Sequence, residues 1–219
     1  CPLFPDWSQA VDDLINRREQ IIGSIDETGQ LKEMVGKGQY LEVAEICAYD
    51  LGDAGYPKYL MENFDREFGP DEIPEAYGEL LAMRPQSILT TNYDRIPDVG
   101  GDGFYSIFST SEISEVQTAI MSGDPCVFKV HGTITDPNSI ILTGRNYQDA
   151  YGSGLKGVLE SVLRLEYVVF LGFSFADPYF VPIVENVFAN SGQRLRGKYA
   201  LLEGLSQMEL TGKERRYGL

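Results

Sequence analysis

Four polar motifs follow short apolar runs in this chain, and each contains residue types that can bind or activate a ligand. They are residues 90–94 (Thr-Thr-Asn-Tyr-Asp), the pair His131-Gly132, residues 172–178 (Gly-Phe-Ser-Phe-Ala-Asp-Pro) and the pair Glu203-Gly204. In an open parallel sheet, ligands bind beyond the carboxyl ends of the strands. If the apolar runs are strands of one sheet, the motifs converge at one edge of it, and this convergence predicts a binding site there.

His131 is the only histidine of the chain. It follows an apolar run, and Gly132 allows the backbone to turn sharply after it. An imidazole at a strand end can act as a general base near neutral pH. A lone histidine can also cap a strand or pack in a core. The presence of Asn92 and Asp94 at a neighbouring strand end favours the catalytic interpretation.

Asn92 and Asp94 offer complementary hydrogen-bonding groups. The Asn92 amide could hold a water molecule or a sugar hydroxyl, and the Asp94 carboxylate could accept from a donor such as a carboxamide NH₂. A plain turn is the alternative, because Asn and Asp both favour turn geometry. Both interpretations remain open from the residues alone.

Residues 172–178 combine backbone freedom with a helix-capping residue. Gly172 and Ser174 could let a ribose or a diphosphate approach the backbone closely. Asp177 is interpreted first as the N-cap of a helix that opens at Pro178. The glycines at 152, 154 and 157 match GxGxxG but do not directly follow a strand, so residues 151–154 are interpreted as a turn into a helix.

Two kinds of hydrophobic spacing indicate the elements that would position these motifs. Residues 6–83 carry apolar side chains three and four positions apart, which predicts mostly helix, with Asp6 as the first N-cap, a break near residues 36–38 and a further helix opening at Pro57. After residue 85, short β-rich runs alternate with helical stretches at 155–165 and 178–190. The runs are residues 87–91, 104–108, 126–130, 167–171 and 198–202.

This alternation predicts an α/β fold: a Rossmann-like open, mostly parallel sheet with helices on both faces. Residues 139–142 are a candidate peripheral strand, which would pair with the segment leaving Gly132 through a turn at 136–138.

The composition excludes several classes of protein. The 33 acidic residues outnumber the 18 basic ones, which gives a formal charge of −15, so no direct nucleic-acid binding is expected. The positive field for an anionic ligand would come from backbone amides, helix N-termini or residues such as Lys129 or Arg145. The three cysteines form no CxxC pair, so no zinc or other metal site is expected. With no apolar run of ~18 residues, we expect a cytoplasmic protein without a membrane segment.

Three of the motifs resemble those of a known family. Residues 90–94, residues 129–132 (Lys-Val-His-Gly) and residues 171–178 resemble the later motifs of Sir2-like domains, and most closely the bacterial branch associated with anti-phage defence. The resemblance runs from about residue 1 to the end of the chain. Residues 3–7 look like the segment that follows the family's Gly-Ala-Gly-x-Ser loop, so the first strand and this glycine-rich loop are expected upstream of residue 1. The resemblance thus implies a single domain over residues 1–219, a piece of a longer chain, with a helical cap at 29–83.

The resemblance also implies an activity. The domain would bind NAD⁺ in a Rossmann-like cleft and hydrolyse it to ADP-ribose and nicotinamide, with Asn92 and His131 in the catalytic positions and Asp94 reading the nicotinamide carboxamide. The wider set of residues implied to contact NAD⁺ is Thr91, Asp94, Gly172, Ser174, Asp177 and Glu203. Defence proteins of this kind act in regulated assemblies, so a homo-oligomer or a complex with a defence-system partner is expected.

Two other functions remain open. The same cleft could bind NAD⁺ or ADP-ribose without turnover, as a sensing module. NAD⁺-dependent deacylation of proteins or ADP-ribosyl transfer is less favoured, because the zinc module of four cysteines found in deacetylase members has no counterpart among the three cysteines here.

Overall fold

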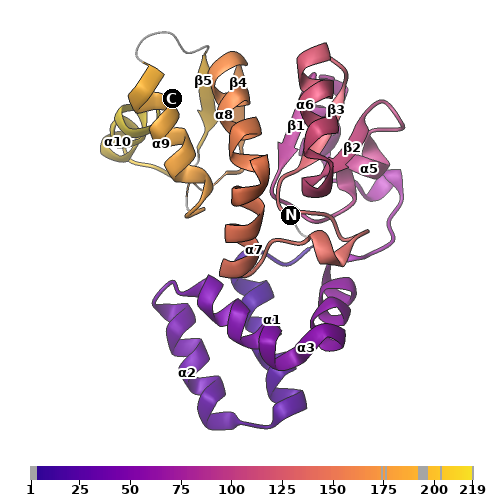
Figure 1. Ribbon diagram of the computed structural model, residues 1–219, viewed down its shortest axis with the longest axis vertical. Coiled ribbons are helices and arrows are strands. Elements are labelled where there is room, and N and C mark those ends of the chain that lie inside the picture. Colours follow the sequence, from indigo (N-terminus) through magenta and orange to yellow (C-terminus); the bar gives the residue numbers. More distant parts are fainter. Residues whose placement is uncertain (1–3, 174, 176, 192–196, 203, 219) are drawn as a thin grey trace. The chain divides into compact units, whose positions relative to one another are not determined.

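The computed structural model describes residues 4–173, 175, 177–191, 197–202 and 204–218. The chain forms an α/β structure that divides into two compact units, residues 1–150 (unit 1) and 151–219 (unit 2), shown in Figure 1. Unit 1 contains a helical region followed by a three-stranded sheet, and unit 2 contains a two-stranded sheet with its own helices.

Unit 1 begins with α1 (Trp7–Ile22), whose start agrees with the predicted cap. The Asp6 carboxylate accepts from the Gln9 backbone N–H at 2.8 Å, and the Gln9 side chain accepts from the Asp6 N–H at 2.9 Å. This reciprocal pair satisfies two backbone donors that the first helical turn leaves free. Gly23 ends the helix in the left-handed conformation, with φ 75°.

The next two helices are α2 (Ile25–Gly36) and α3 (Tyr40–Phe64), separated by the predicted break near residues 36–38. Helix α3 is kinked at Gly52, where φ is 66° and ψ is −176°. The helix resumes before Pro57, so this proline lies inside α3 and the prediction that it opens a helix was wrong. A 3₁₀ turn η1 (Pro70–Glu72) and α4 (Glu75–Ala82) complete the helical region.

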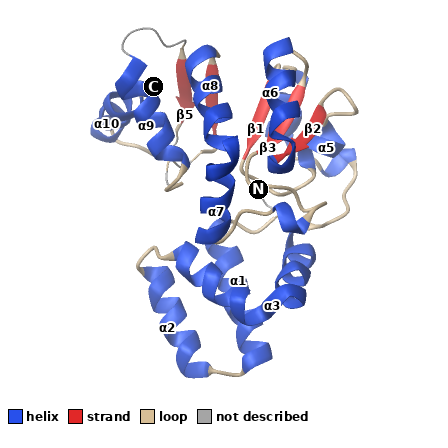
Figure 2. Cartoon of the chain, in the orientation of Figure 1, coloured by secondary structure: helices blue, strands red, loops and turns tan. Residues whose placement is uncertain are grey.

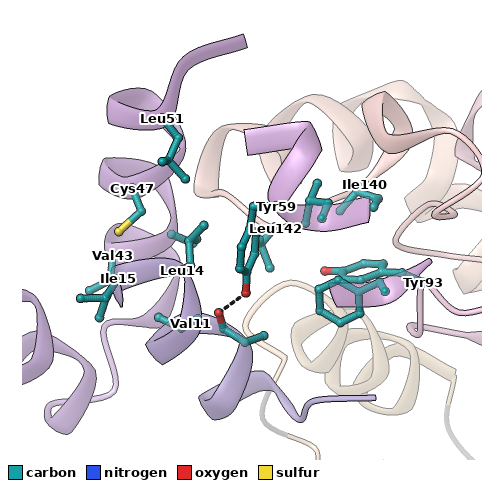
Figure 3. Close-up of a cluster of buried hydrophobic side chains, with 14 of the residues drawn as sticks. Val11, Leu14, Ile15, Val43, Cys47, Leu51, Tyr59, Tyr93, Ile140 and Leu142 are labelled. Carbon is teal, nitrogen blue, oxygen red and sulfur yellow. Dashed lines mark hydrogen bonds between the residues drawn. The ribbon is translucent and has the colours of Figure 1, made fainter. Parts of the chain in front are cut away.

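A buried cluster joins α1 and α3 to loops of the sheet (Figure 3). Leu14 and Ile15 of α1 pack in it together with Tyr59 of α3, whose hydroxyl donates to the Ala10 carbonyl. The same cluster includes Tyr93, which follows the first strand, and a set from the segment after the third strand: Ile134, Ile140 and Leu142. The helical region therefore packs against the two loops that carry the candidate site.

The sheet of unit 1 consists of β1 (Ser87–Thr90), β2 (Ser106–Ser109) and β3 (Cys126–Lys129), in the order β1-β3-β2. Both neighbouring pairs are parallel, as predicted, and every residue of the central strand β3 is buried. Helix α5 (Ile96–Gly100) connects β1 to β2, and the 3₁₀ turn η2 (Thr110–Glu112) followed by α6 (Ile113–Ser122) connects β2 to β3. Helix α6 packs on β2 and β3 (Figure 2).

The predicted peripheral strand at residues 139–142 is absent from this part of the structure. Residues 137–139 form a 3₁₀ turn, η3 (Pro137–Ser139), which agrees with the predicted turn, and α7 (Gly144–Ala150) follows. Ile140, Ile141 and Leu142 are almost fully buried in irregular backbone. Their apolar character comes from this burial in the core rather than from strand pairing, because buried loop and strand segments share the same composition.

Unit 2 contains α8 (Lys156–Leu165), β4 (Val168–Leu171), α9 (Phe180–Ser191), β5 (Lys198–Leu201) and α10 (Gln207–Tyr217). Strands β4 and β5 pair in parallel, with Val168 opposite Lys198. Residues 151–155 form a π-helical turn, η4 (Tyr151–Leu155), directly before α8, so the predicted simple turn at 151–154 is instead a wide helical turn. Parallel strands connected by helices confirm the predicted Rossmann-like α/β class.

Candidate functional site

Unit 1 brings the motifs after β1 and β3 to the same edge of its sheet. Thr90 and Lys129 are opposite each other in the parallel register, and the Val130 N–H extends the ladder by donating to the Thr90 carbonyl at 2.8 Å. Asn92 and His131 each lie two residues beyond this matched pair. The adjacent parallel strands thus place an amide and an imidazole at neighbouring strand ends, where ligands bind in open α/β sheets.

Backbone contacts tie the two strand-end loops together. The Ile134 N–H donates to the Tyr93 carbonyl at 3.0 Å, and the Tyr93 hydroxyl donates to the Ile141 carbonyl at 2.8 Å. The Ile141 N–H in turn donates to the His131 carbonyl at 2.9 Å. These bonds and the buried Tyr93 ring hold the Asn92 and His131 segments in one local arrangement.

Asn92 is exposed, and its neighbour Thr91 is half-buried. The Asn92 backbone N–H donates to the Thr90 hydroxyl at 3.1 Å, which turns the chain at the end of β1. Tyr77 of α4 lies beside this turn. Burial and the charge of Asp94 raise the pKa of Tyr77, while side-chain hydrogen bonds with Thr90 and Asn92 act in the opposite direction.

Asp94 is buried, with 5% of its surface exposed. Its Oδ1 accepts from the Ile96 N–H at 2.9 Å, at the start of α5. Burial raises the pKa of Asp94, and the bond from Ile96 and the charge of Lys129 moderate the increase. The turn that was the alternative interpretation of this motif is therefore present, and one carboxylate oxygen is engaged in it.

Lys129 lies in a buried polar cluster behind the strand ends. Its ammonium donates to the Asp94 carbonyl at 2.8 Å and to the Thr133 hydroxyl at 3.2 Å, and it lies 2.7 Å from Oδ2 of Asp98. The Lys129 side chain is 0% exposed. Asp98 pairs with this buried cation, so Lys129 does not present a free positive charge at the strand ends.

His131 is buried, with 4% of its surface exposed. Its ring meets the Tyr147 ring of α7 edge-to-face, with centroids 5.1 Å apart. The turn that follows requires glycine: Gly132 has φ 86°, and a Cβ there would lie 2.1 Å from the Ser139 carbonyl oxygen. The sequence-based suggestion of a glycine-dependent turn after His131 is confirmed.

Unit 2 holds Gly172 and Asp177 after β4. Gly172 adopts φ 62°, and nothing lies within 4 Å of the position of a Cβ. Asp177 accepts from the N–H groups of Tyr179 and Phe180 at 2.8 and 2.7 Å, which confirms its capping role at the start of α9. Two other residues of the predicted site, Ser174 and Glu203, lie outside the described residues.

Sequence reasoning missed residues that come from elements other than strand ends. Asp98 neutralises Lys129, and Tyr77 of α4 lies beside Asn92. Arg95 lines a cavity of about 460 Å³ in unit 1. The proximity of Arg95 and Asp98 in sequence to Asp94 was an available signal, whereas the contact of Tyr77 depends on how α4 packs.

Among the described residues, no His, Cys, Asp and Glu side chains gather in a group of three or more that could hold a metal ion. The same part of the chain contains no helix with the length and apolar character needed to cross a membrane.

These features define an α/β protein of the Rossmann-like class with a candidate site at the carboxyl edge of a parallel sheet. A family model described as "SIR2-like domain" matches residues 86–217. Because this match covers more than half of the chain, the protein belongs to the SIR2-like family, and the resemblance drawn from the three motifs is confirmed.

Three characterised relatives are similar over most of this chain. "NAD(+) hydrolase ThsA" of Enterococcus faecium is 26% identical over 160 residues, which are 71% of this chain and 33% of that protein. The ThsA protein of Bacillus cereus (strain MSX-D12) is 25% identical over 179 residues, 78% of this chain and 35% of that protein. "Defense-associated sirtuin 2" of Bacillus subtilis is 22% identical over 182 residues, 80% of this chain and 17% of that protein. This chain spans about a third or less of the length of these relatives.

Proposed function

We propose that this protein is an NAD⁺ glycohydrolase that cleaves NAD⁺ to ADP-ribose and nicotinamide. The observation that carries the proposal is the position of Asn92 and His131, two residues beyond a matched pair of neighbouring parallel strands. The relation to NAD⁺ hydrolases supports NAD⁺ as the substrate. An amide and an imidazole at one sheet edge are the groups that such a hydrolysis requires.

The proposed reaction breaks the bond between C1′ of the ribose and the nicotinamide nitrogen. As in other glycosidic cleavages, the transition state has oxocarbenium character, and nicotinamide leaves with the bonding electron pair. The Asn92 amide orients the attacking water, and His131 accepts the proton that this water loses as its oxygen bonds to C1′. The products are ADP-ribose, nicotinamide and a proton.

Further residues would bind and orient NAD⁺. Asp94 is proposed to read the nicotinamide carboxamide with the carboxylate oxygen that does not accept from Ile96. The proposed contacts to the rest of NAD⁺ come from Thr91, Gly172, Ser174, Asp177 and Glu203. Residues 29–83 are proposed to form a cap over the cleft, which the packing of α3 against Tyr93 in the buried cluster supports.

The similarity to a defence-associated sirtuin also supports a proposal about the biological role of this protein. We place the protein among effectors of bacterial anti-phage defence that deplete NAD⁺. In this proposal the activity is regulated by self-association or by a partner protein of the defence system.

The test is nicotinamide release from NAD⁺ by the full-length protein, with and without partner proteins encoded beside it. Release that disappears in both Asn92→Ala and His131→Ala supports hydrolysis at this site. Saturable NAD⁺ or ADP-ribose binding without release, in every condition, would instead favour a sensing module. Release that requires an acylated peptide would favour the deacylase alternative.

A further inference from the structure

A cavity of about 460 Å³ lies in unit 1, and neither Asn92 nor His131 is among the residues that line it. Its volume falls within the range of roughly 300–1,000 Å³ that is usual for small-molecule sites. The residues that line it come from the segment after α3, from the N-cap of α5 and from α5 itself: Arg66, Glu67, Phe68, Gly69, Arg95 and Val99. We call this cavity the arginine pocket.

Arg95 is one of the two arginines that line the arginine pocket. It directly follows Asp94 and is half-buried. Among the described residues, its Nε is buried and has no hydrogen-bond partner. A buried donor without an acceptor is costly, and for a guanidinium the matching acceptor is a carboxylate or phosphate group that can take two parallel bonds. The Arg95 side chain is thus suited to receive an oxyanion from the cavity.

Arg66 provides a second guanidinium. It is exposed and pairs with Glu72 at 3.0 Å, and both side chains are about half accessible to solvent. Such an exposed ion pair contributes little stability, so an incoming anion can replace Glu72 as the partner of Arg66. Glu67 is the one carboxylate among the lining residues, and Glu72 is the partner of Arg66, so Arg95 is the arginine of the lining that has no ion pair among the described residues.

The remaining lining is neutral. Phe68 contributes an aromatic ring, which meets the Phe4 ring edge-on at 6.1 Å, and Val99 of α5 adds an aliphatic surface. A cavity with guanidinium groups beside an aromatic ring fits a molecule that combines phosphate with an organic part.

We propose that the arginine pocket binds the phosphate oxygens of a phosphorylated small molecule, with Arg95 as the main contact and Arg66 as the second. Two sources share this chemistry. The phosphate can belong to NAD⁺ and its product ADP-ribose, or to a separate phosphorylated effector. The proposal concerns binding, so it stands or falls independently of the NAD⁺ hydrolysis proposed above.

Isothermal titration calorimetry of the full-length protein with pyrophosphate, ADP-ribose and NAD⁺ tests this proposal. Arg95→Gln removes the charged donor, and Arg66→Gln provides a second variant at an exposed position. Arg84→Gln is the matched control, because Arg84 stacks on Phe104 at 4.9 Å and is not part of the lining. Thermal unfolding of each variant verifies that it is folded.

We expect pyrophosphate affinity to fall at least ~10-fold in Arg95→Gln, in line with the loss of a charge-assisted hydrogen bond, by a smaller factor in Arg66→Gln, and not in Arg84→Gln. A parallel loss of affinity for ADP-ribose and NAD⁺ would assign the pocket to the phosphates of NAD⁺. Loss of pyrophosphate binding with unchanged NAD⁺ affinity would assign it to a separate effector. Absence of pyrophosphate binding to the unmodified protein, or equal affinity in folded Arg95→Gln, would overturn the proposal.

Discussion

The Lys129 ammonium lies 2.7 Å from Oδ2 of Asp98, and the lysine side chain is fully buried while the aspartate is 23% exposed. The same ammonium donates to the Asp94 carbonyl and to the Thr133 hydroxyl. One buried cation therefore connects β3 to the loop after β1, to α5 and to the loop that follows His131. This arrangement places a structural charge directly behind the candidate site.

Replacing Lys129 should destabilise unit 1. Lys129→Met leaves the partly buried Asp98 without its counter-ion and the Asp94 carbonyl without its donor, and breaking a buried pair in this way costs on the order of 3 kcal/mol. Urea unfolding measures the change in the free energy of unfolding. Lys58→Met is the control, because Lys58 forms an exposed pair with Glu62 at 3.7 Å and should change stability by less than about 0.5 kcal/mol. Equal unfolding midpoints for the two variants would contradict this role of Lys129.

Gly132 should not tolerate a side chain. In Gly132→Ala the new Cβ would start 2.1 Å from the Ser139 carbonyl oxygen, and the left-handed φ of 86° adds a conformational cost of roughly 1–2 kcal/mol. We expect a large fall in the melting temperature, or loss of soluble protein. Gly103→Ala is the matched control, because Gly103 has φ 71° and nothing lies within 4 Å of the position of a Cβ. This control variant should lose only the stability that corresponds to the conformational cost. A melting temperature for Gly132→Ala as high as that of Gly103→Ala would rule out the close contact.

Removing either proposed catalytic group should abolish most turnover. We expect Asn92→Ala and His131→Ala each to lower NAD⁺ cleavage by at least ~100-fold, the scale of losing an aligning group or a general base. Nicotinamide release measures the rate, and circular dichroism verifies that each variant is folded. Asn138→Ala is a control for Asn92, because Asn138 is an exposed residue of η3. Full activity in a folded His131→Ala protein would remove His131 from the mechanism.

The buried carboxyl group of Asp94 should make stability depend on pH. Burial raises its pKa above the ordinary value of 3.8, so at a pH between 3.8 and the raised pKa the folded state holds a proton on Asp94 that the unfolded chain releases. The associated stability is present below 3.8 and is lost as the pH rises through the raised pKa. Asp94→Asn keeps a side-chain oxygen for the Ile96 N–H but cannot ionise. Its stability relative to the original protein should therefore increase from pH ~4 towards neutrality, then level off. Urea unfolding across this range measures the difference, and a constant difference would argue against the raised pKa.

The local elements of this protein follow from its sequence. The Asp6 and Asp177 caps, the turn at Gly132 and the five short strands all depend on near neighbours in the chain, and the structure agrees with each of them within a few residues. The motif at residues 90–94 and the pair His131-Gly132 could be recognised for the same reason. Parallel strands must bring their carboxyl ends to one edge, so the proximity of the Asn92 and His131 segments was also predictable.

The positions of other side chains depended on packing between segments distant in sequence. Residues 139–142 have the composition of a strand, yet they fill a core that α1 and α3 also build, and only the tertiary structure distinguishes these two uses of apolar residues. The position of Lys129 at the end of a predicted strand was compatible with contact to a ligand. The tertiary structure instead buries its side chain and pairs its ammonium with Asp98 of α5. The arginine pocket likewise arises because the segment after α3 lies beside α5 and its N-cap, Arg95. The sequence by itself determined the helical character of residues 6–83, the helices near 155–165 and 178–190, the strands and the strand-end motifs, because these follow from local conformational preference and periodicity. The tertiary structure decided which polar groups are buried and paired and which line a cavity, because burial and pairing depend on contacts between distant parts of the chain.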